Sequence, residues 1–189
     1  MNVKLVDAMT RYFSGDPKRI SHFMKVCAYA VYIGESEGLD PTTLHILEAA
    51  ALVHDIGVKK SEEIHGRGVY DGKKQEKYGP PLAEAMLREL GEDEATIQRV
   101  SYLVSRHHTY SDVDGIDYRI LLEADFIVNA YEDERPVDFI RTGRDIVFQT
   151  KTGIAIVNEI FNFNHARRRN VRHFKSGISD VSQFFILVR

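Results

Sequence analysis

The sequence predicts an all-α fold in a single domain. Apolar residues recur at three- and four-residue spacing through most of the chain, whereas the alternating pattern of half-buried strands is nearly absent before the final residues. A length of 189 residues with 43% hydrophobic content suits one core, and no linker divides the chain. We therefore expect a helical bundle over residues 1–161, followed by a C-terminal segment at 162–189.

Capping signals and apolar spacing predict the first three helices. A short helix spans about residues 3–13. Asp16-Pro17 then supplies an N-cap and a first turn whose backbone angle proline presets. Asp40-Pro41 repeats this signal, and the third helix is expected to continue through Ile56, with Gly57 as its C-cap.

The middle of the chain is less regular. Residues 59–77 are polar, contain three glycines and predict a loop with no more than one short helix. Pro80-Pro81 predicts the start of a further helix, which Gly91 ends. The remaining helices are expected near residues 92–108, 117–131, 137–148 and 152–161.

The composition gives no reason to expect a membrane or nucleic acid as a partner. The formal net charge is -3. No apolar stretch approaches the roughly 20 residues of a membrane span, and the first residues lack the apolar core of a signal peptide. The single cysteine, Cys27, excludes an internal disulfide and fits a reducing compartment. We expect a cytoplasmic protein, with a homo-oligomer left open.

His54 and Asp55 stand side by side where the apolar run 46–53 ends. A buried imidazole beside a buried carboxylate costs several kcal/mol unless each finds a partner. A divalent metal ion would satisfy both. His22 and Asp125 also fall on the apolar faces of their own predicted helices, so further ligand-type side chains point inward.

Each of these residues also has a structural explanation. His22 taken alone is more often a hydrogen-bonded core histidine, and Asp125 suits an ion pair with an arginine or a helix cap. His107 and His108 at a helix end would complement the helix dipole. All these explanations must hold at once, whereas one metal ion accounts for every residue together. We therefore interpret the set as a metal site.

The order His22, His54-Asp55, Asp125 resembles the HD superfamily of metal-dependent phosphohydrolases, named for its His-Asp pair. The surroundings of these residues, at 19–22, 51–57 and 123–125, are similar to the family signatures. The resemblance covers about residues 16–160. It implies an all-α domain that holds the metal between helices through His22, His54, Asp55 and Asp125.

The resemblance also implies an activity: hydrolysis of a phosphate ester of a small molecule, a nucleotide or other phosphomonoester, through a metal-activated water. Two imidazoles and two carboxylates suit Mn²⁺, Fe²⁺, Co²⁺, Ni²⁺ or Mg²⁺. Asp55 would also accept a proton from the attacking water. His107 and His108 would bind phosphate, protonate the leaving group or ligate a second ion. Three cations, each also plausible as a solvated surface charge, are candidates for binding the phosphate: Lys59, Lys60 and Arg106.

Two departures from the family pattern favour a single metal ion. Many two-metal relatives carry a lysine directly after the His-Asp-Ile-Gly segment, where this chain has Val58. They also carry a further ligand histidine, which the corresponding segment 76–80 lacks and for which His65 falls too early. A second ion is therefore disfavoured.

Two alternatives stay open, the first of them because of these departures. One is a non-catalytic module with the HD fold that senses a metal or a nucleotide. The other is a diiron oxygenase-like use of the fold, which needs two metal ions. Specificity would come from loops, so the sequence does not name the substrate.

The C-terminal segment 162–189 is a separate question. It holds six arginines and lysines against Asp180 alone. Such a run suits nucleic acid or an acidic partner, although it is more often a solvated tail. Residues 184–188 are apolar and predict a strand.

Overall fold

The computed structural model describes residues 2–163, and every regular element in that range is an α-helix. The predicted all-α fold is confirmed. Within these residues the helices are α1 (Val3–Tyr12), α2 (Pro17–Ser36), α3 (Pro41–Val53), α4 (Gly57–His65), α5 (Gly72–Leu90), α6 (Glu94–Val104), α7 (Ile116–Glu132), α8 (Val137–Val147) and α9 (Lys151–Ile160).

Most of these helices begin at a side chain that accepts a hydrogen bond from the first turn. The Asp16 carboxylate accepts from the Arg19 amide at the start of α2. Asp40 accepts from the amides of Thr42 and Thr43 at the start of α3. The two Asp-Pro signals therefore act as predicted. Asn2, Asp71, Asp93 and Thr150 cap α1, α5, α6 and α9 in the same way.

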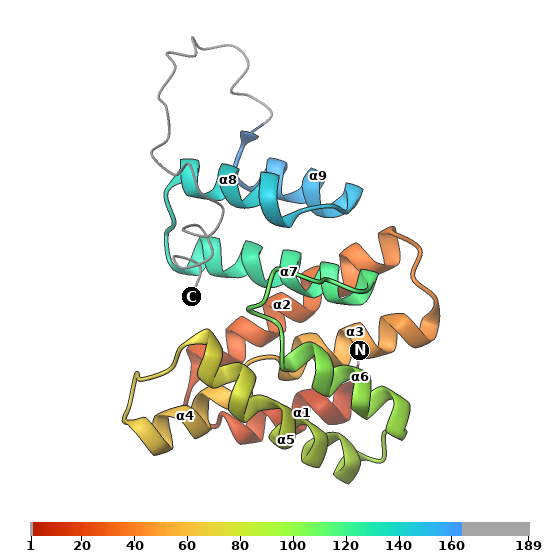
Figure 1. Cartoon of the computed structure of the whole chain (residues 1–189), viewed down its shortest axis with the longest axis vertical. Coiled ribbons are helices and arrows are strands. Elements are labelled where there is room, and N and C mark those ends of the chain that lie inside the picture. The colour runs from red at the N-terminus through yellow and green to blue at the C-terminus, as the bar shows by residue number, and fades with distance from the viewer. Residues whose placement is uncertain (1, 164–189) are drawn as a thin grey trace.

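Helices α2 and α7 lie side by side across the middle of the molecule (Figure 1). Helices α1, α3, α4, α5 and α6 lie on one side of this pair, and α8 and α9 lie on the other side, against α7. Helix α3 packs against α2, α6 and α7 at once. Its entire second half is buried, so the residues that follow α3 are delivered to the centre of the fold.

The chain turns sharply between α3 and α4. Helix α3 ends one residue before His54, and residues 54–56 form a turn that leads into α4 at Gly57. The prediction that α3 continues through this turn, with Gly57 as its C-cap, is wrong. A Cβ atom on Gly57 would lie 2.7 Å from the Gln75 carbonyl oxygen and 2.7 Å from the Gly79 nitrogen. Glycine is needed here because α4 and α5 approach closely.

Residues 59–77 are more helical than the sequence predicts. Helix α4 extends to His65, and α5 begins at Gly72, directly after its cap Asp71. The predicted helix start at Pro80-Pro81 is therefore wrong, because both prolines lie inside α5. Prolines lack the amide donor that a helix interior uses. Helix α5 nevertheless continues through them, and it packs along both α4 and α6, which stabilises it.

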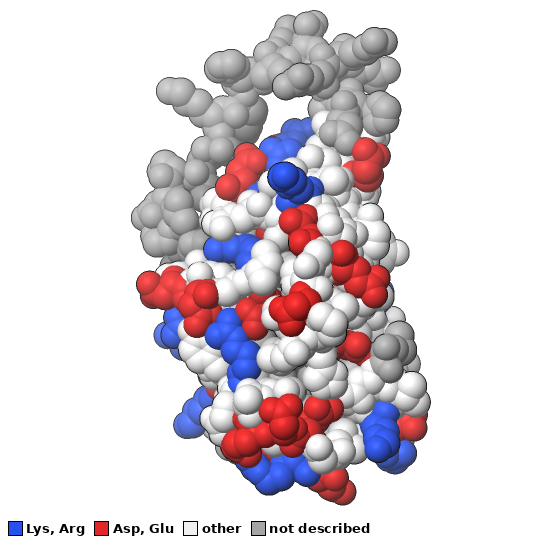
Figure 2. All heavy atoms as spheres, turned by 90° about the vertical axis from the view of Figure 1, so that its right-hand side faces the viewer, with Lys and Arg blue, Asp and Glu red and all other residues white. Residues whose placement is uncertain are grey.

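The surface carries charges of both signs. On the face shown in Figure 2, acidic and basic side chains are interspersed over the described residues. Among these residues, no helix combines the length and apolar character needed to cross a bilayer. The basic run and the predicted strand at 184–188 lie outside the described residues.

Candidate metal centre

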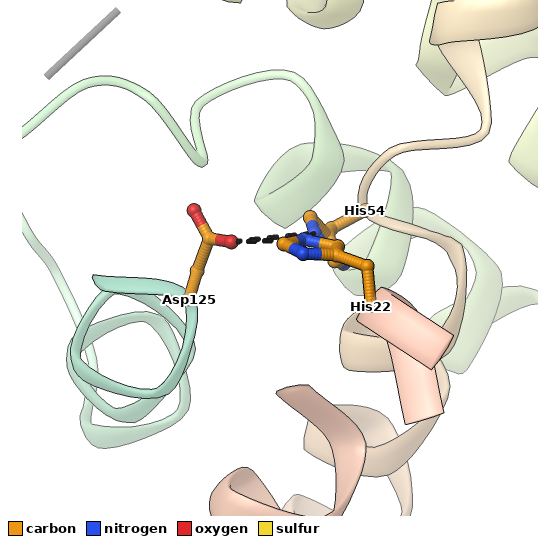
Figure 3. Close-up of side chains that lie close together, drawn as sticks. All are labelled: His22, His54 and Asp125. Atoms are coloured by element: carbon orange, nitrogen blue, oxygen red, sulfur yellow. Dashed lines mark hydrogen bonds and ion pairs between the residues drawn. The ribbon is translucent and has the colours of Figure 1, made fainter. Parts of the chain in front are cut away.

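Three side chains from separate elements point toward one another in the middle of the bundle (Figure 3). His22 lies on α2, His54 in the turn after α3, and Asp125 on α7. His22 Nε2 lies 3.2 Å from His54 Nε2 and 3.3 Å from Asp125 Oδ1. His54 Nε2 lies 3.5 Å from the same Asp125 oxygen. All three residues are buried, and we call them the inner group.

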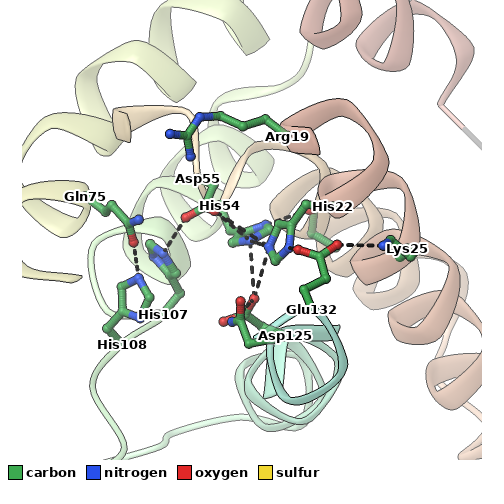
Figure 4. Close-up of polar contacts among 12 residues, drawn as sticks. Arg19, His22, Lys25, His54, Asp55, Gln75, His107, His108, Asp125 and Glu132 are labelled. Atoms are coloured by element: carbon green, nitrogen blue, oxygen red, sulfur yellow. Dashed lines mark hydrogen bonds and ion pairs between the residues drawn. The ribbon is translucent and has the colours of Figure 1, made fainter. Parts of the chain in front are cut away.

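A second set of ligand-type residues, the outer group, lies beside the first and consists of Asp55, His107 and His108 (Figure 4). Asp55 Oδ1 lies 3.5 Å from His107 Nε2. Asp55 Oδ2 lies 3.6 Å from His22 Nε2 and 3.7 Å from His54 Nε2. Asp55 therefore contacts both groups. In each group, three potential ligand atoms lie within 4.8 Å of one another, which is close enough to hold a metal ion.

Backbone carbonyls orient two of the imidazole rings. His54 Nδ1 lies 2.8 Å from the Ala51 oxygen, and His107 Nδ1 lies 2.8 Å from the Val104 oxygen. A carbonyl oxygen only accepts, so Nδ1 donates in both rings and Nε2 faces the centre. His107 Nε2 is buried and makes no hydrogen bond within residues 2–163. Its contact with Asp55 Oδ1 at 3.5 Å is too long for a good hydrogen bond, so the outer group has room for a further partner, such as a substrate group.

The donor set fits a divalent cation. His22 Nδ1 donates to the Glu132 carboxylate at 3.0 Å, so in the neutral rings both His22 Nε2 and His54 Nε2 present lone pairs to each other. Two lone pairs at 3.2 Å need a positive charge between them. Ligands held at about 2.1 Å from one ion are roughly 3 Å apart, close to the spacing found here. The mixture of imidazole and carboxylate suits Mn²⁺, Fe²⁺, Co²⁺, Ni²⁺ or Mg²⁺.

The same atoms stabilise a proton. Burial alone would lower the pKa of His22, but its hydrogen bonds with Asp125 and Glu132 raise it to about 10. Burial would raise the pKa of Asp125, but its hydrogen bonds with His22 and His54 hold that pKa well below its usual range. The inner group is therefore built to stabilise positive charge, and a metal ion displaces a proton on binding.

The outer group has a different electrostatic character. Burial opposes ionisation of Asp55, but the neighbouring charges of His54 and His107 hold its pKa below the usual range. Burial also opposes protonation of His107, but the contact with Asp55 raises its pKa. Burial and the charge of His107 lower the pKa of His108 to about 3, so this ring is neutral near pH 7. Its Nε2 is in contact with the Gln75 side-chain oxygen.

A cavity of about 390 Å³ opens onto both groups. His22, Asp55, Asp125 and His108 line it, whereas the fully buried His54 and His107 lie behind its wall. The lining also includes three cationic side chains: Lys18, Arg19 and Arg135.

Arg19 is held in place by fixed partners. Its Nε lies 3.1 Å from Asp16 Oδ2, its Nη2 lies 3.1 Å from Glu62 Oε1, and its guanidinium lies 4.5 Å from the centre of the Tyr70 ring. Its side chain is 17% exposed. A guanidinium that is fixed in this way, three residues before His22, is preorganised for an anion in the cavity.

The three cations predicted to bind phosphate lie elsewhere. Lys59 Nζ donates to the Tyr12 carbonyl oxygen at 2.9 Å, and the exposed Lys60 pairs with Glu63 at 3.1 Å. Arg106 reaches a backbone oxygen in the loop after α6. None of the three lines the cavity. The sequence could not reveal the positions of Lys59 and Lys60, because the turn at 54–56 changes the direction of the chain before α4.

Two polar residues on α7 escaped the sequence analysis. Asn129 Nδ2 donates to Asp125 Oδ1 at 2.9 Å, and Glu132 contacts His22. Both line the cavity together with Asp125. The spacing 125, 129, 132 places them on one face of a helix, and this signal was available from the sequence.

A match to a known family model shows which family the chain belongs to. A family model described as HD domain matches residues 19–138, well over half of the chain and a range that contains both groups. The chain belongs to the HD domain family. The resemblance inferred from the sequence is confirmed, and with it membership of a superfamily of metal-dependent phosphohydrolases. Neither the curated proteins nor the solved structures that were searched gave a match.

Proposed function

We propose that this HD domain is a metal-dependent phosphohydrolase that cleaves a phosphate ester of a small molecule, a nucleotide or other phosphomonoester. The observation that carries the proposal is the convergence of the inner group and Asp55 on a cavity that also presents fixed cations. Its volume of about 390 Å³ falls within the range of small-molecule sites, roughly 300–1,000 Å³.

The proposal includes one divalent ion, held by His22, His54, Asp55 and Asp125. Such an ion supplies Lewis-acid polarisation of the phosphoryl group and of the attacking water. A second ion would need the outer group. The contact between Gln75 and His108 Nε2 supports a single ion, because it engages one of the two ring nitrogens with which His108 could bind a metal.

The side chains of the chain itself have separate roles in this proposal. Asp55, whose side chain is 19% exposed and lines the cavity, accepts a proton from the attacking water. His108 is neutral and lines the cavity, so it contacts the substrate, while His107 lies behind Asp55 and orients it. Arg19, in place of the three cations predicted from the sequence, offsets the phosphate charge.

A screen of phosphate esters tests the proposal. Purified protein loaded with Mn²⁺, Co²⁺ or Ni²⁺ is incubated with nucleotides and other phosphomonoesters, and released phosphate is measured. Asp55→Ala is expected to reduce hydrolysis by at least about 100-fold, because a proton acceptor and a ligand are both lost. Asp138→Ala, at a carboxylate that is 76% exposed on α8, is the matched control. Absence of cleavage by the loaded protein, or full activity of Asp55→Ala, contradicts the proposal.

One observation favours the rival function, a sensor module with the HD fold. The lysine that many relatives carry after the His-Asp-Ile-Gly segment is replaced by Val58, and Lys59 lies outside the cavity. Tight binding of a nucleotide without turnover would decide for the sensor. Metal analysis that finds one ion per chain would remove the diiron alternative. The proposal keeps the expected cytoplasmic location, which the single buried cysteine supports.

A further inference from the structure

The three histidines that face the centre differ in what holds them. Each ring donates from Nδ1, which leaves Nε2 directed inward. His54 and His107 donate to backbone carbonyls, which are neutral. His22 donates instead to the Glu132 carboxylate, at 3.0 Å. Glu132 is the only anion among these three Nδ1 partners.

Glu132 is itself held by a cation. Its Oε1 lies 2.6 Å from Lys25 Nζ, and its Oε2 accepts from His22. Lys25 follows His22 by three residues on α2, so both residues face the same end of α7 (Figure 4). Glu132 is the last residue of α7, where the helix dipole disfavours a carboxylate, and Lys25 compensates for this. The Glu132 side chain is only 11% exposed.

We propose that Glu132 is a positioning residue of the metal site: its carboxylate, anchored by Lys25, selects the His22 tautomer whose Nε2 lone pair faces His54 and Asp125. This inference rests on the proposed function, because it assigns His22 as a metal ligand. A carboxylate behind a ligating imidazole also makes that imidazole a stronger ligand. Glu132 contacts His22 at Nδ1, on the opposite side of the ring from the inward Nε2, so it acts through that ligand.

The tautomer gives a distinctive prediction for Glu132→Gln. The carboxylate offers one oxygen to Lys25 and the other to His22, whereas an amide has only one oxygen. The Lys25 ammonium forms the stronger, charge-assisted hydrogen bond and takes that oxygen. The amide NH₂ then faces His22 Nδ1, which forces the proton onto Nε2, inside the metal site. Metal binding is weakened although the side chain keeps its size.

The experiment measures the dissociation constant for Mn²⁺ alone, by calorimetry on the full chain. Glu132→Gln is expected to weaken binding by about 10- to 100-fold, as is typical for partners of metal ligands. Adding Lys25→Met to Glu132→Gln frees the amide oxygen for His22 and is expected to restore much of the affinity. Glu63→Gln on α4 is the matched control, since it makes the same substitution at a half-exposed carboxylate that pairs with Lys60 outside the cavity.

The rescue separates positioning from a structural role, because Lys25→Met frees the amide oxygen for His22 but adds no contact that would repair a weakened fold. Wild-type affinity of Glu132→Gln, or a double variant no better than Glu132→Gln alone, overturns the inference. A measurement on the unmodified protein gives a second test. With Zn²⁺ bound, ¹⁵N NMR is expected to show His22 protonated at Nδ1, and a proton at Nε2 overturns the inference.

Failure of the inference is distinguishable from failure of the proposed function. If the wild-type chain binds Mn²⁺ and cleaves phosphate esters while Glu132→Gln does so equally well, only the inference fails. If the wild-type chain binds no Mn²⁺, the metal centre itself is refuted and the inference falls with it.

Discussion

The inner and outer groups contain the same kinds of side chain but are prepared differently. In the inner group, each member has a second partner that fixes it: Glu132 for His22, the Ala51 carbonyl for His54, and Asn129 for Asp125. In the outer group, the Val104 carbonyl fixes His107 in the same way, but His107 Nε2 makes no hydrogen bond within the described part of the chain. The side chain of Gln75 contacts His108 Nε2, one of the two ring nitrogens with which His108 could bind a metal.

The difference shows what distinguishes a preorganised ion site from a cluster of ligand-type residues. Ligands that are already oriented lose little freedom on binding, so the inner group is the stronger site. Asp55 belongs to the outer group by contact with His107 and approaches the inner group through its other oxygen. We infer that the inner group and Asp55 bind the ion, and that Asp55 and His108, which line the cavity, act on the substrate.

The largest effect that tests this division is the loss of the ion itself. His54→Ala is expected to lower the metal content of the purified protein from about one ion per chain to near zero, because an inner ligand is removed. His107→Ala is expected to keep the ion while hydrolysis falls by at least about 10-fold, because Asp55 loses its orienting partner. Elemental analysis and phosphate release measure the two outcomes. Equal metal loss in both variants would contradict the inference that the ion depends on the inner group and not on His107.

Gln75 tests the difference between the two groups at the outer group. Gln75→Ala removes the contact with His108 Nε2, so both ring nitrogens of His108 become available beside Asp55 and His107. In excess Mn²⁺ the metal content of this variant is expected to rise from about one ion toward about two per chain. Gln98→Ala on α6, whose amide donates to the exposed Glu94, is a matched control that should stay near one. A wild-type protein that already holds two ions would refute the single-ion proposal.

A smaller effect is expected at the cavity wall. Arg19→Met removes a fixed guanidinium from the cavity and is expected to raise the KM for a phosphate ester about 10-fold, the size of one charge-assisted hydrogen bond. Lys59→Met removes a cation that lies outside the cavity and should change KM less than about twofold. Steady-state kinetics compare the two. A larger effect at Lys59 than at Arg19 would restore the assignment made from the sequence.

The smallest expected effect is a loss of stability that leaves the metal content unchanged. Arg99 binds both oxygens of Asp117 at 2.7 and 2.8 Å and also bonds to Asp114, away from both groups. Arg99→Met is expected to lower the free energy of unfolding by about 1–3 kcal/mol near pH 7 without changing metal content. Thermal unfolding and elemental analysis measure this.

The ion pair between Arg99 and Asp114 predicts that the stability of the fold depends on pH. The hydrogen bond from Arg99 lowers the pKa of Asp114, so the folded value lies below the unfolded one. The resulting stability is present above roughly pH 4 and is lost as the pH falls through the folded pKa. The difference in Tm between wild type and Arg99→Met should therefore shrink in acid, by a small amount because Asp114 is about half exposed. A constant difference down to pH 3 would contradict this.

Sequence patterns were reliable where local chemistry decides the structure. The Asp16 and Asp40 caps start their helices as predicted, and the inward faces of His22 and Asp125 follow from apolar spacing alone. They failed at Gly57, where the close approach of α5 sets the backbone requirement. Such an approach depends on residues far along the chain, which no local pattern records.

The sequence by itself determined the all-α fold, the types of candidate ligand and the HD family. Helix periodicity depends on neighbouring residues, and the family motif is recognised from the order of its residues along the chain. Only the tertiary structure decided which cations face the cavity and what holds each ligand. Lys59 follows the His-Asp pair closely yet lies outside the cavity, while Glu132 lies 110 residues from His22 and touches it. Packing of α2 against α7 makes that contact, since it brings together side chains whose separation along the chain carries no information about distance in space.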